Sequence, residues 1–246
     1  ELKRGLASLK YFCEDAPEYH VAVAGSLLGL TLHEGDSYPV GKVNTLNMYP
    51  MTFEEFLLAC NRKQMVDLLQ AQRWDFVKGL RTLYMQHLRE YYLVGGMPEA
   101  VDKFVQTNDA NLVREVQNEI LAAYERDISK HAPAEQVMRI GQVWHSIPSQ
   151  LAKENRKFIY GVVKKGARAK DYELAIQWLL DAGLVYKVNR VTTLAMPLKI
   201  HEEISAFKLF MLDCGLLGAM SLTPPAMLLL PSTDNSGKGD FTAVSY

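Results

Sequence analysis

The chain has 246 residues, a formal net charge of −1, 48% hydrophobic and 22% charged residues, a balance typical of a globular protein. No run approaches the roughly 18 apolar residues that cross a membrane, so we expect no membrane contact and a cytoplasmic location. The three cysteines and six histidines are scattered without a C-x-x-C or H-x-x-x-H pair. This spacing excludes the usual zinc motifs and a disulfide framework, and we expect no bound metal.

The first fifty residues follow the pattern of a parallel α/β sheet. A helical stretch, LASLKYFCED at 6–15, precedes the apolar run HVAVAGS at 20–26, which is typical of a buried strand. A second alternating run, VNTLNMY at 43–49, predicts the next strand. Because functional residues gather at the carboxyl ends of parallel strands, Ser26 is the first candidate site residue.

Between these runs, GDSYPVGKV at 35–43 is similar to a phosphate-binding loop. Such a loop is G-x-x-x-x-G-K-[ST], with backbone N–H groups around the phosphates and a hydroxyl on magnesium. Here five residues separate Gly35 from Gly41, and Lys42 is followed by Val43, which has no hydroxyl. A strand pattern follows, whereas a phosphate loop opens a helix. The sequence therefore favours a turn between two strands.

From there to about residue 130 the pattern is helical. MTFEEFLLACN places Thr52 as N-cap and Glu55 at the third helical position, which predicts a capping box. GGMP at 95–98 predicts a corner, because the glycine pair ends one helix and Pro98 fits the first turn of the next. A paired glycine also lets backbone approach a ligand closely, so a binding role for Gly96 stays open beside the corner.

Residues 134–200 predict a winged helix. Two amphipathic helices, 134–154 and 170–183, are followed by LVYKVNRVTTLAMPLKI at 184–200, which alternates like a pair of strands. Helices followed by a two-stranded ribbon are the elements of that fold.

A strongly basic stretch, residues 153–170, lies between those helices. Seven lysines and arginines face one acid, Glu154, so the stretch carries +6 and the remaining chain sums to −7. Such asymmetry is expected of nucleic-acid contact. A solvated surface or a protein contact stays open as an alternative, because winged helices also serve as protein-binding modules. The candidate DNA-contacting residues are Lys164, Lys165 and Arg168.

The last segment begins with ISAFKLFMLDCGLLGAM at 204–220, which predicts a strand that enters a helix. FKLFMLD is similar to the magnesium-holding strand of a nucleotidase, but the acid that should follow Asp213 is Cys214. The remainder, 221–246, has paired prolines and little periodicity, so it predicts an unpacked end.

Taken together, the segments resemble the AAA-type ATPases of bacteria and archaea that carry a C-terminal domain of unknown function. The matching stretches stand in the family order and cover most of the chain. They are AGSLLG at 24–29, SYPVGKV at 37–43, YPMTFEEFLLA at 49–59, YYLVGGMPEAV at 91–101, the run at 146–188, and SAFKLFMLDCGLLGAM at 205–220.

The resemblance implies an α/β plus mostly α fold in four parts. These are a remnant of the parallel-sheet ATPase core at 1–60, a helical lid with the GGMP motif at 61–112, a winged helix at 113–200, and the truncated start of a nuclease-like α/β domain at 201–246.

The resemblance also implies residue roles. Ser26 matches the polar sensor position, which in the parent fold lies near the γ-phosphate. Gly96 and Pro98 match a lid motif in which the proline packs near the nucleotide base. Lys42 falls where many members have an arginine, and lysine lacks the planar fork of an arginine finger.

Family members bind ATP with magnesium, but the two motifs for this are missing here. Neither G-x-x-x-x-G-K-[ST] nor an apolar run followed by Asp-Glu occurs in the 246 residues. Since phosphoryl transfer rests on those groups, we predict a fragment of such an ATPase that neither binds nor hydrolyses ATP by itself. DNA and a second copy of the chain are the predicted partners. An independent hydrolase that uses Asp213 or a Ser–His pair has no motif in its support.

Overall fold

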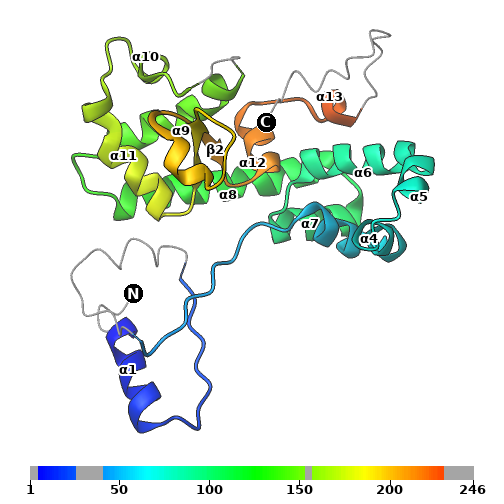
Figure 1. The fold of residues 1–246 in the computed structure, drawn as a ribbon, viewed down its shortest axis with the longest axis horizontal. Coiled ribbons are helices and arrows are strands. Elements are labelled where there is room, and N and C mark those ends of the chain that lie inside the picture. The colour runs from blue at the N-terminus through cyan, green and yellow to red at the C-terminus, as the bar shows by residue number, and fades with distance from the viewer. Residues whose placement is uncertain (1–4, 26–40, 153–156, 230–246) are drawn as a thin grey trace.

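The structure is a computed structural model that describes residues 5–25, 41–152 and 157–229. This part of the chain is mostly helical, with one two-stranded antiparallel sheet (Figure 1). In chain order the elements are α1 (Gly5–Asp15), α3 (Phe53–Ala59), α4 (Lys63–Gln70), α5 (Trp74–Gly79), α6 (Arg81–Val94), α7 (Pro98–Thr107), α8 (Ala110–His131), α9 (Val137–Leu151), α10 (Tyr160–Val163), α11 (Ala169–Asp181), β1 (Val185–Val191), the 3-10 helix η1 (Leu198–His201), β2 (Glu202–Met211), α12 (Cys214–Met220) and α13 (Pro225–Leu229).

The predicted parallel sheet is wrong for the described residues. Helix α1 forms as expected, but residues 20–25 and 43–49 are not strands, and Val23 and Met48 are 57% and 89% exposed. A parallel strand is stabilised by hydrogen bonds to neighbouring strands and by cover on both faces. Among the described residues no strand pairs with either run, and most of their side chains are exposed. Ser26 and the turn at 35–40 lie outside the described residues.

The helical predictions for the middle of the chain are confirmed. The capping box is present, because the Thr52 amide donates to Glu55 Oε2 at 2.7 Å and the Glu55 amide donates to Thr52 Oγ1 at 3.3 Å. The GGMP corner is present too, since α6 ends at Val94 and α7 begins with Pro98 in its first turn.

Helix α8 links two hydrophobic clusters. Val113 and Val116 pack with α3, α6 and α7 around Phe56 and Phe104, whose rings stack with centroids 5.9 Å apart. Further along α8, residues such as Leu121 pack into a larger cluster around the fully buried Trp144. With 22 residues the helix is about 33 Å long, which is enough to reach both. A third, smaller cluster joins α3, α4 and α6.

The strand pair lies later in the chain than predicted. β1 pairs antiparallel with β2, from Val185 opposite Met211 to Val191 opposite Glu202. The second strand therefore lies outside the predicted range 184–200. Within that range, Pro197 has no backbone N–H to donate to a neighbouring strand. FKLFMLD, predicted to lie at the start of the next domain, supplies the second half of β2, and the boundary at 200 falls inside η1. The boundaries at 60 and 112 stay predictions.

Two further features of the described residues concern membrane spans and metal ligands. Within the described residues, no helix is both long and apolar enough to cross a membrane. The same residues contain no group of three or more metal-ligating side chains.

A basic turn and a glycine junction as candidate functional sites

The predicted site residues fall in two separate places. Lys164, Lys165 and Arg168 lie between α10 and α11, at one end of the molecule, whereas Gly96 and Pro98 lie at the corner between α6 and α7 (Figure 1). The structure therefore does not bring the two sets together.

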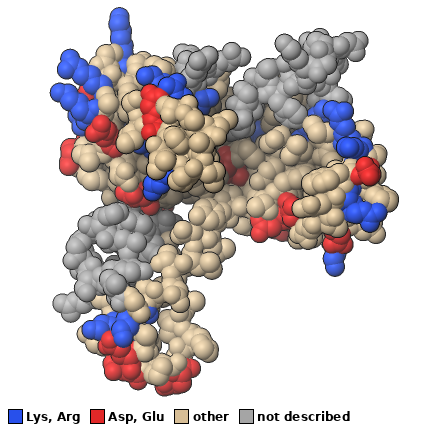
Figure 2. Space-filling view, viewed as in Figure 1, with Lys and Arg blue, Asp and Glu red and all other residues tan. Residues whose placement is uncertain are grey.

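The basic turn, residues 164–170, presents its cations to solvent. Lys164, Lys165, Arg168 and Lys170 are all exposed, and basic side chains gather over the α10–α11 end (Figure 2). Gly166 has φ +80°, a value that lets the chain reverse between the two helices. The Arg168 amide donates to Asp171 Oδ2 at 3.3 Å and so fixes the start of α11. The turn thus holds four cations at the N-terminal end of a 13-residue helix.

The glycines of the GGMP corner are buried against other parts of the protein. Gly95 has φ 76° and ψ −166°, and a Cβ there would lie 2.2 Å from Asp213 Oδ1. A Cβ on Gly96 would lie 2.1 Å from the Met51 carbonyl oxygen. Glycine at both positions is explained by these close approaches, whereas Pro98 is exposed at the start of α7.

Asp213 joins the α6–α7 corner to the start of α12. Its side chain is buried; it accepts from the Gly96 amide at 2.6 Å and, as N-cap of α12, from the Leu216 amide at 2.9 Å. Burial raises the pKa of the Asp213 carboxyl, and backbone N–H donors from Gly96, Leu216 and Gly215 offset part of that effect. One carboxyl group therefore satisfies amides from two turns more than a hundred residues apart.

The contact between the α6–α7 corner and the start of α12 is called the glycine junction below. Gln117 of α8 also binds to it. Its fully buried side-chain amide donates to the carbonyl oxygens of Leu93 and Val94 at 2.8 and 2.9 Å. These are the last carbonyls of α6, which no helical amide can reach. Gly215 packs on the same end, since a Cβ there would lie 2.4 Å from the Val94 oxygen.

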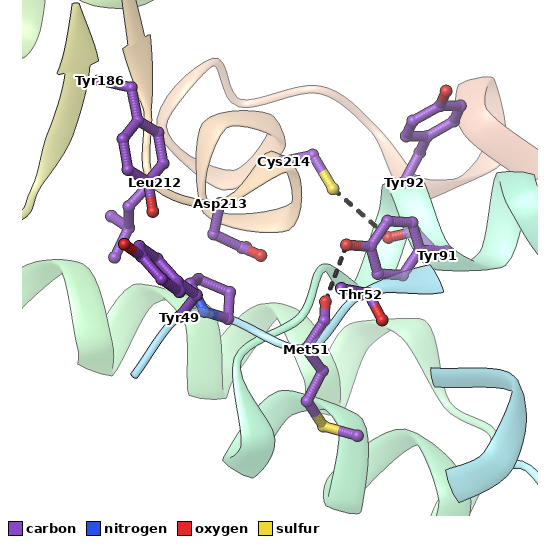
Figure 3. Close-up of a pocket in the computed structure, with 10 residues that line it drawn as sticks. Tyr49, Met51, Thr52, Tyr91, Tyr92, Tyr186, Leu212, Asp213 and Cys214 are labelled. Atoms are coloured by element: carbon purple, nitrogen blue, oxygen red, sulfur yellow. Dashed lines mark hydrogen bonds between the residues drawn. The ribbon is translucent and has the colours of Figure 1, made fainter. Parts of the chain in front are cut away.

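Residues 49–52 run across this junction as an extended strap. The Met51 amide donates to the Gly96 oxygen at 2.7 Å, and the Tyr91 hydroxyl donates to the Met51 oxygen at 2.8 Å. In Figure 3, Met51 lies below Tyr91, and Asp213 and Cys214 lie above Met51. Both backbone polar groups of Met51 are therefore paired.

A cavity of about 510 Å³ opens beside the strap. Its walls come from the strap, the end of α6, β1 and the turn after β2, and four of its lining residues are tyrosines. The lining residues are Tyr49, Pro50, Met51, Thr52, Tyr91, Tyr92, Tyr186, Leu212, Asp213 and Cys214. None of them is a lysine or arginine, so the described walls offer no cation for a phosphate.

The chemistry of this cavity favours packing over catalysis. Burial raises the pKa of both the Tyr91 hydroxyl and the Cys214 thiol, so neither ionises readily to a nucleophile. The Cys214 sulfur instead lies 3.7 Å from the Tyr91 carbonyl oxygen. The arrangement holds three chain segments together.

Several residues of the junction were not predicted from sequence. Asp213 stands before an apolar helical run, which is an N-cap signal, but its acceptance of the Gly96 amide has no local signature. Gln117 and Gly215 likewise act on the end of α6 from distant positions in the chain.

Comparison with known families gives two matches. The model of an AAA domain matches residues 1–57, and the model of a domain of unknown function (DUF8612) matches residues 85–226, more than half of the chain. Proteins with AAA domains typically bind ATP and magnesium. Comparison with curated proteins and with solved structures gives no match. The chain therefore belongs to the DUF8612 family, and in it that domain follows AAA-domain sequence, the arrangement that the resemblance predicted.

Proposed function

We propose that residues 137–211 form a winged helix that binds duplex DNA through the basic turn, and that this chain by itself neither binds nor hydrolyses ATP. The observation that carries the first part is the order of α9, α10, α11, β1 and β2, with four exposed cations where the second and third helices meet.

The pairing of the strands supports a winged helix. Between α9 and α10, the Phe158 amide donates to the Phe207 oxygen of β2 at 2.6 Å, so a short third segment joins the hairpin. The Phe158 and Phe207 rings also stack, with centroids 5.6 Å apart. The order is therefore helix, strand-like segment, two helices joined by a glycine-containing turn, and a hairpin. Two helices so joined are a common DNA-binding unit.

The position of the basic turn supports contact with DNA. In helix-turn-helix proteins the N-terminal end of the second helix lies at the major groove. Here that end is the start of α11, with Arg168 and Lys170 on it and Lys164 and Lys165 just before it. The partial positive charge of a helix N-terminus also favours a phosphate.

The exposed face of α11 suits phosphate contact better than base recognition. Glu173, Leu174 and Gln177 follow the basic turn and are exposed. An acid and an apolar side chain at the centre of the helix supply few donors for base edges. We therefore expect binding that depends on salt and little on DNA sequence.

Replacing Lys164, Lys165 and Arg168 together with alanine should weaken duplex binding by at least about tenfold at moderate salt. The slope of log K against log salt should fall by about 2 to 3, because each lost phosphate contact removes close to one released counterion. Fluorescence anisotropy with a labelled duplex, repeated at several salt concentrations, measures both quantities.

The matched control removes the same charge elsewhere. Lys63, Lys78 and Arg81 are exposed on α4, α5 and α6, at the other end of the molecule (Figure 1). Their triple alanine variant should leave the affinity and the salt slope close to those of the parent chain. Equal losses in both triple variants, or none in either, would contradict DNA binding by the basic turn.

Protein binding is the second candidate, and exposed apolar side chains on the hairpin favour it. Leu194 and Met196, in the loop between the strands, are 90% and 83% exposed, and Ile200 in η1 and Ile204 in β2 are exposed as well. Apolar side chains gathered on a surface mark protein contacts more often than nucleic-acid contacts. Unchanged DNA affinity in the basic-turn variant would favour this second candidate.

The proposed absence of ATP binding by this chain is supported by the contacts of Gly95, Gly96 and Lys42. The Gly96 amide already donates to Asp213, and the Gly95 amide donates to the Tyr91 oxygen at 2.7 Å, so neither glycine amide of the corner is free for a phosphate. The Lys42 ammonium lies 3.2 Å from Glu14 Oε1. The sequence contains no phosphate loop to compensate.

A titration with a fluorescent ATP analogue and magnesium, followed by anisotropy, should therefore show no saturable binding. A protein with an intact phosphate loop, titrated in parallel, verifies the probe. Saturable, magnesium-dependent binding would overturn this part of the proposal, and Lys42→Ala would then show whether that lysine holds the phosphates.

A further inference from the structure

The strap, residues 49–52, lies where the two matched regions meet. It belongs to the region matched by the AAA model, whereas Gly96, Tyr91 and Asp213 belong to the region matched by the domain of unknown function. Figure 1 shows α1 apart from the helical body, which the chain enters along an extended stretch that ends at α3. Within the AAA-matched sequence that the structure describes, the strap leads directly into α3, which packs on the helices through Phe56 and Leu57.

A continuous series of hydrogen bonds leads from the strap to the hairpin. The Gly96 residue is held at both ends, since its oxygen accepts from Met51 and its amide donates to Asp213. Asp213 is the second residue after the end of β2. The next residue back, Leu212, donates its amide to the Leu184 oxygen at 3.1 Å, just before β1. Gly96 and Asp213 thus connect the strap to the residues at the end of the hairpin.

A cavity lies beside the strap, but the contacts at three glycines of this series are close. A Cβ on Gly96 would overlap the strap, and a Cβ on Gly95 would overlap Asp213. A Cβ on Gly215 would lie 2.6 Å from the Gly95 nitrogen. Beside it, Tyr49 of the strap approaches Tyr186 of β1, with ring centroids 6.4 Å apart. Because closely packed interiors transmit strain, a shift of the strap must move its neighbours.

We infer that residues 49–52 couple the two regions: a change in the position of the AAA-domain sequence passes through Gly96 and Asp213 to the β1–β2 hairpin. This inference goes beyond DNA binding, because it concerns how the two regions act on each other. The hydrogen bond from the Tyr91 hydroxyl to the Met51 oxygen holds the strap against α6. Removing this one bond is the simplest way to weaken the coupling.

Hydrogen–deuterium exchange of the whole chain under native conditions, read by mass spectrometry, tests the coupling. Tyr91→Phe removes only the hydroxyl that holds the strap. Loss of one hydrogen bond should speed exchange about three- to tenfold in peptides that contain the Met51 amide. If the regions are coupled, peptides that contain the amides of Leu212 and Leu216 should also exchange faster. Gly96→Ala, which displaces the strap directly, should give a larger change in the same peptides.

Tyr84→Phe is the matched control. Tyr84 lies on the same helix, and its hydroxyl donates to the Met65 oxygen at 2.8 Å, in the cluster that does not reach the hairpin. It should speed exchange near Met65 and leave the Leu212 peptides unchanged. Faster exchange at Met51 alone in Tyr91→Phe, or an equal change at Leu212 in both tyrosine variants, would overturn the inference. Tyr91→Phe keeps the test decisive if Gly96→Ala does not fold. The readout requires neither DNA nor ATP, so its outcome is independent of the proposed DNA binding.

Discussion

Replacing Asp213 with alanine should lower the free energy of unfolding by about 3–5 kcal/mol. The change leaves the amides of Gly96 and Leu216 without their acceptor. A buried donor without a partner costs about 1–3 kcal/mol, and loss of an N-cap adds to this. Urea unfolding, followed by far-ultraviolet circular dichroism, measures the difference.

A second N-cap aspartate provides the control. Asp109 caps α8 by accepting from the Asn111 amide at 2.8 Å, but it is partly exposed, and water can replace it. Asp109→Ala should therefore cost only about 0.5–2 kcal/mol. If Asp213→Ala were no more destabilising than Asp109→Ala, the junction would not depend on the buried carboxyl group.

Replacing Gly95 with alanine should destabilise the protein by at least about 3 kcal/mol. Its φ of 76° and ψ of −166° fall in a region that is essentially restricted to glycine, where other residues carry about 1–3 kcal/mol of strain. The new methyl group would also meet Asp213 Oδ1 at 2.2 Å, so the carboxyl group would have to move away from the amides that it satisfies. The same urea unfolding experiment measures the loss.

Gly141 in α9 is the matched glycine. Nothing lies within 4 Å of the Cβ position there, and its φ is not positive. Alanine has a higher helix propensity, so Gly141→Ala should stabilise the protein by about 0.5–1 kcal/mol. A Gly95→Ala protein as stable as the parent would show that the close approach to Asp213 is not required.

The features that sequence predicts correctly here depend on neighbouring residues. The capping box of Thr52 and Glu55 and the corner at Gly95–Pro98 are each formed within one helical turn, so their residue types are sufficient signals. The exposure of Lys164 and Lys165 follows from the cost of burying charge.

The features that sequence misses depend on distant partners. The runs at 20–25 and 43–49 have strand composition, but a strand forms only beside another. The sequence pattern predicts the second hairpin strand too early in the chain, because alternation before Pro197 looks the same as alternation after it. The reason that Gly95 must be glycine lies 118 positions later, at Asp213, and no periodicity connects the two.

Helix α8 determines how the folded chain can be divided. Its first turns complete the cluster around Phe56, and its later turns complete the cluster around Trp144. The predicted boundary at residue 112 falls inside this helix, just before Val113. A cut there would leave an open apolar face on both products. The helices before and after it should therefore melt in a single cooperative transition, and neither half should survive proteolysis without the other.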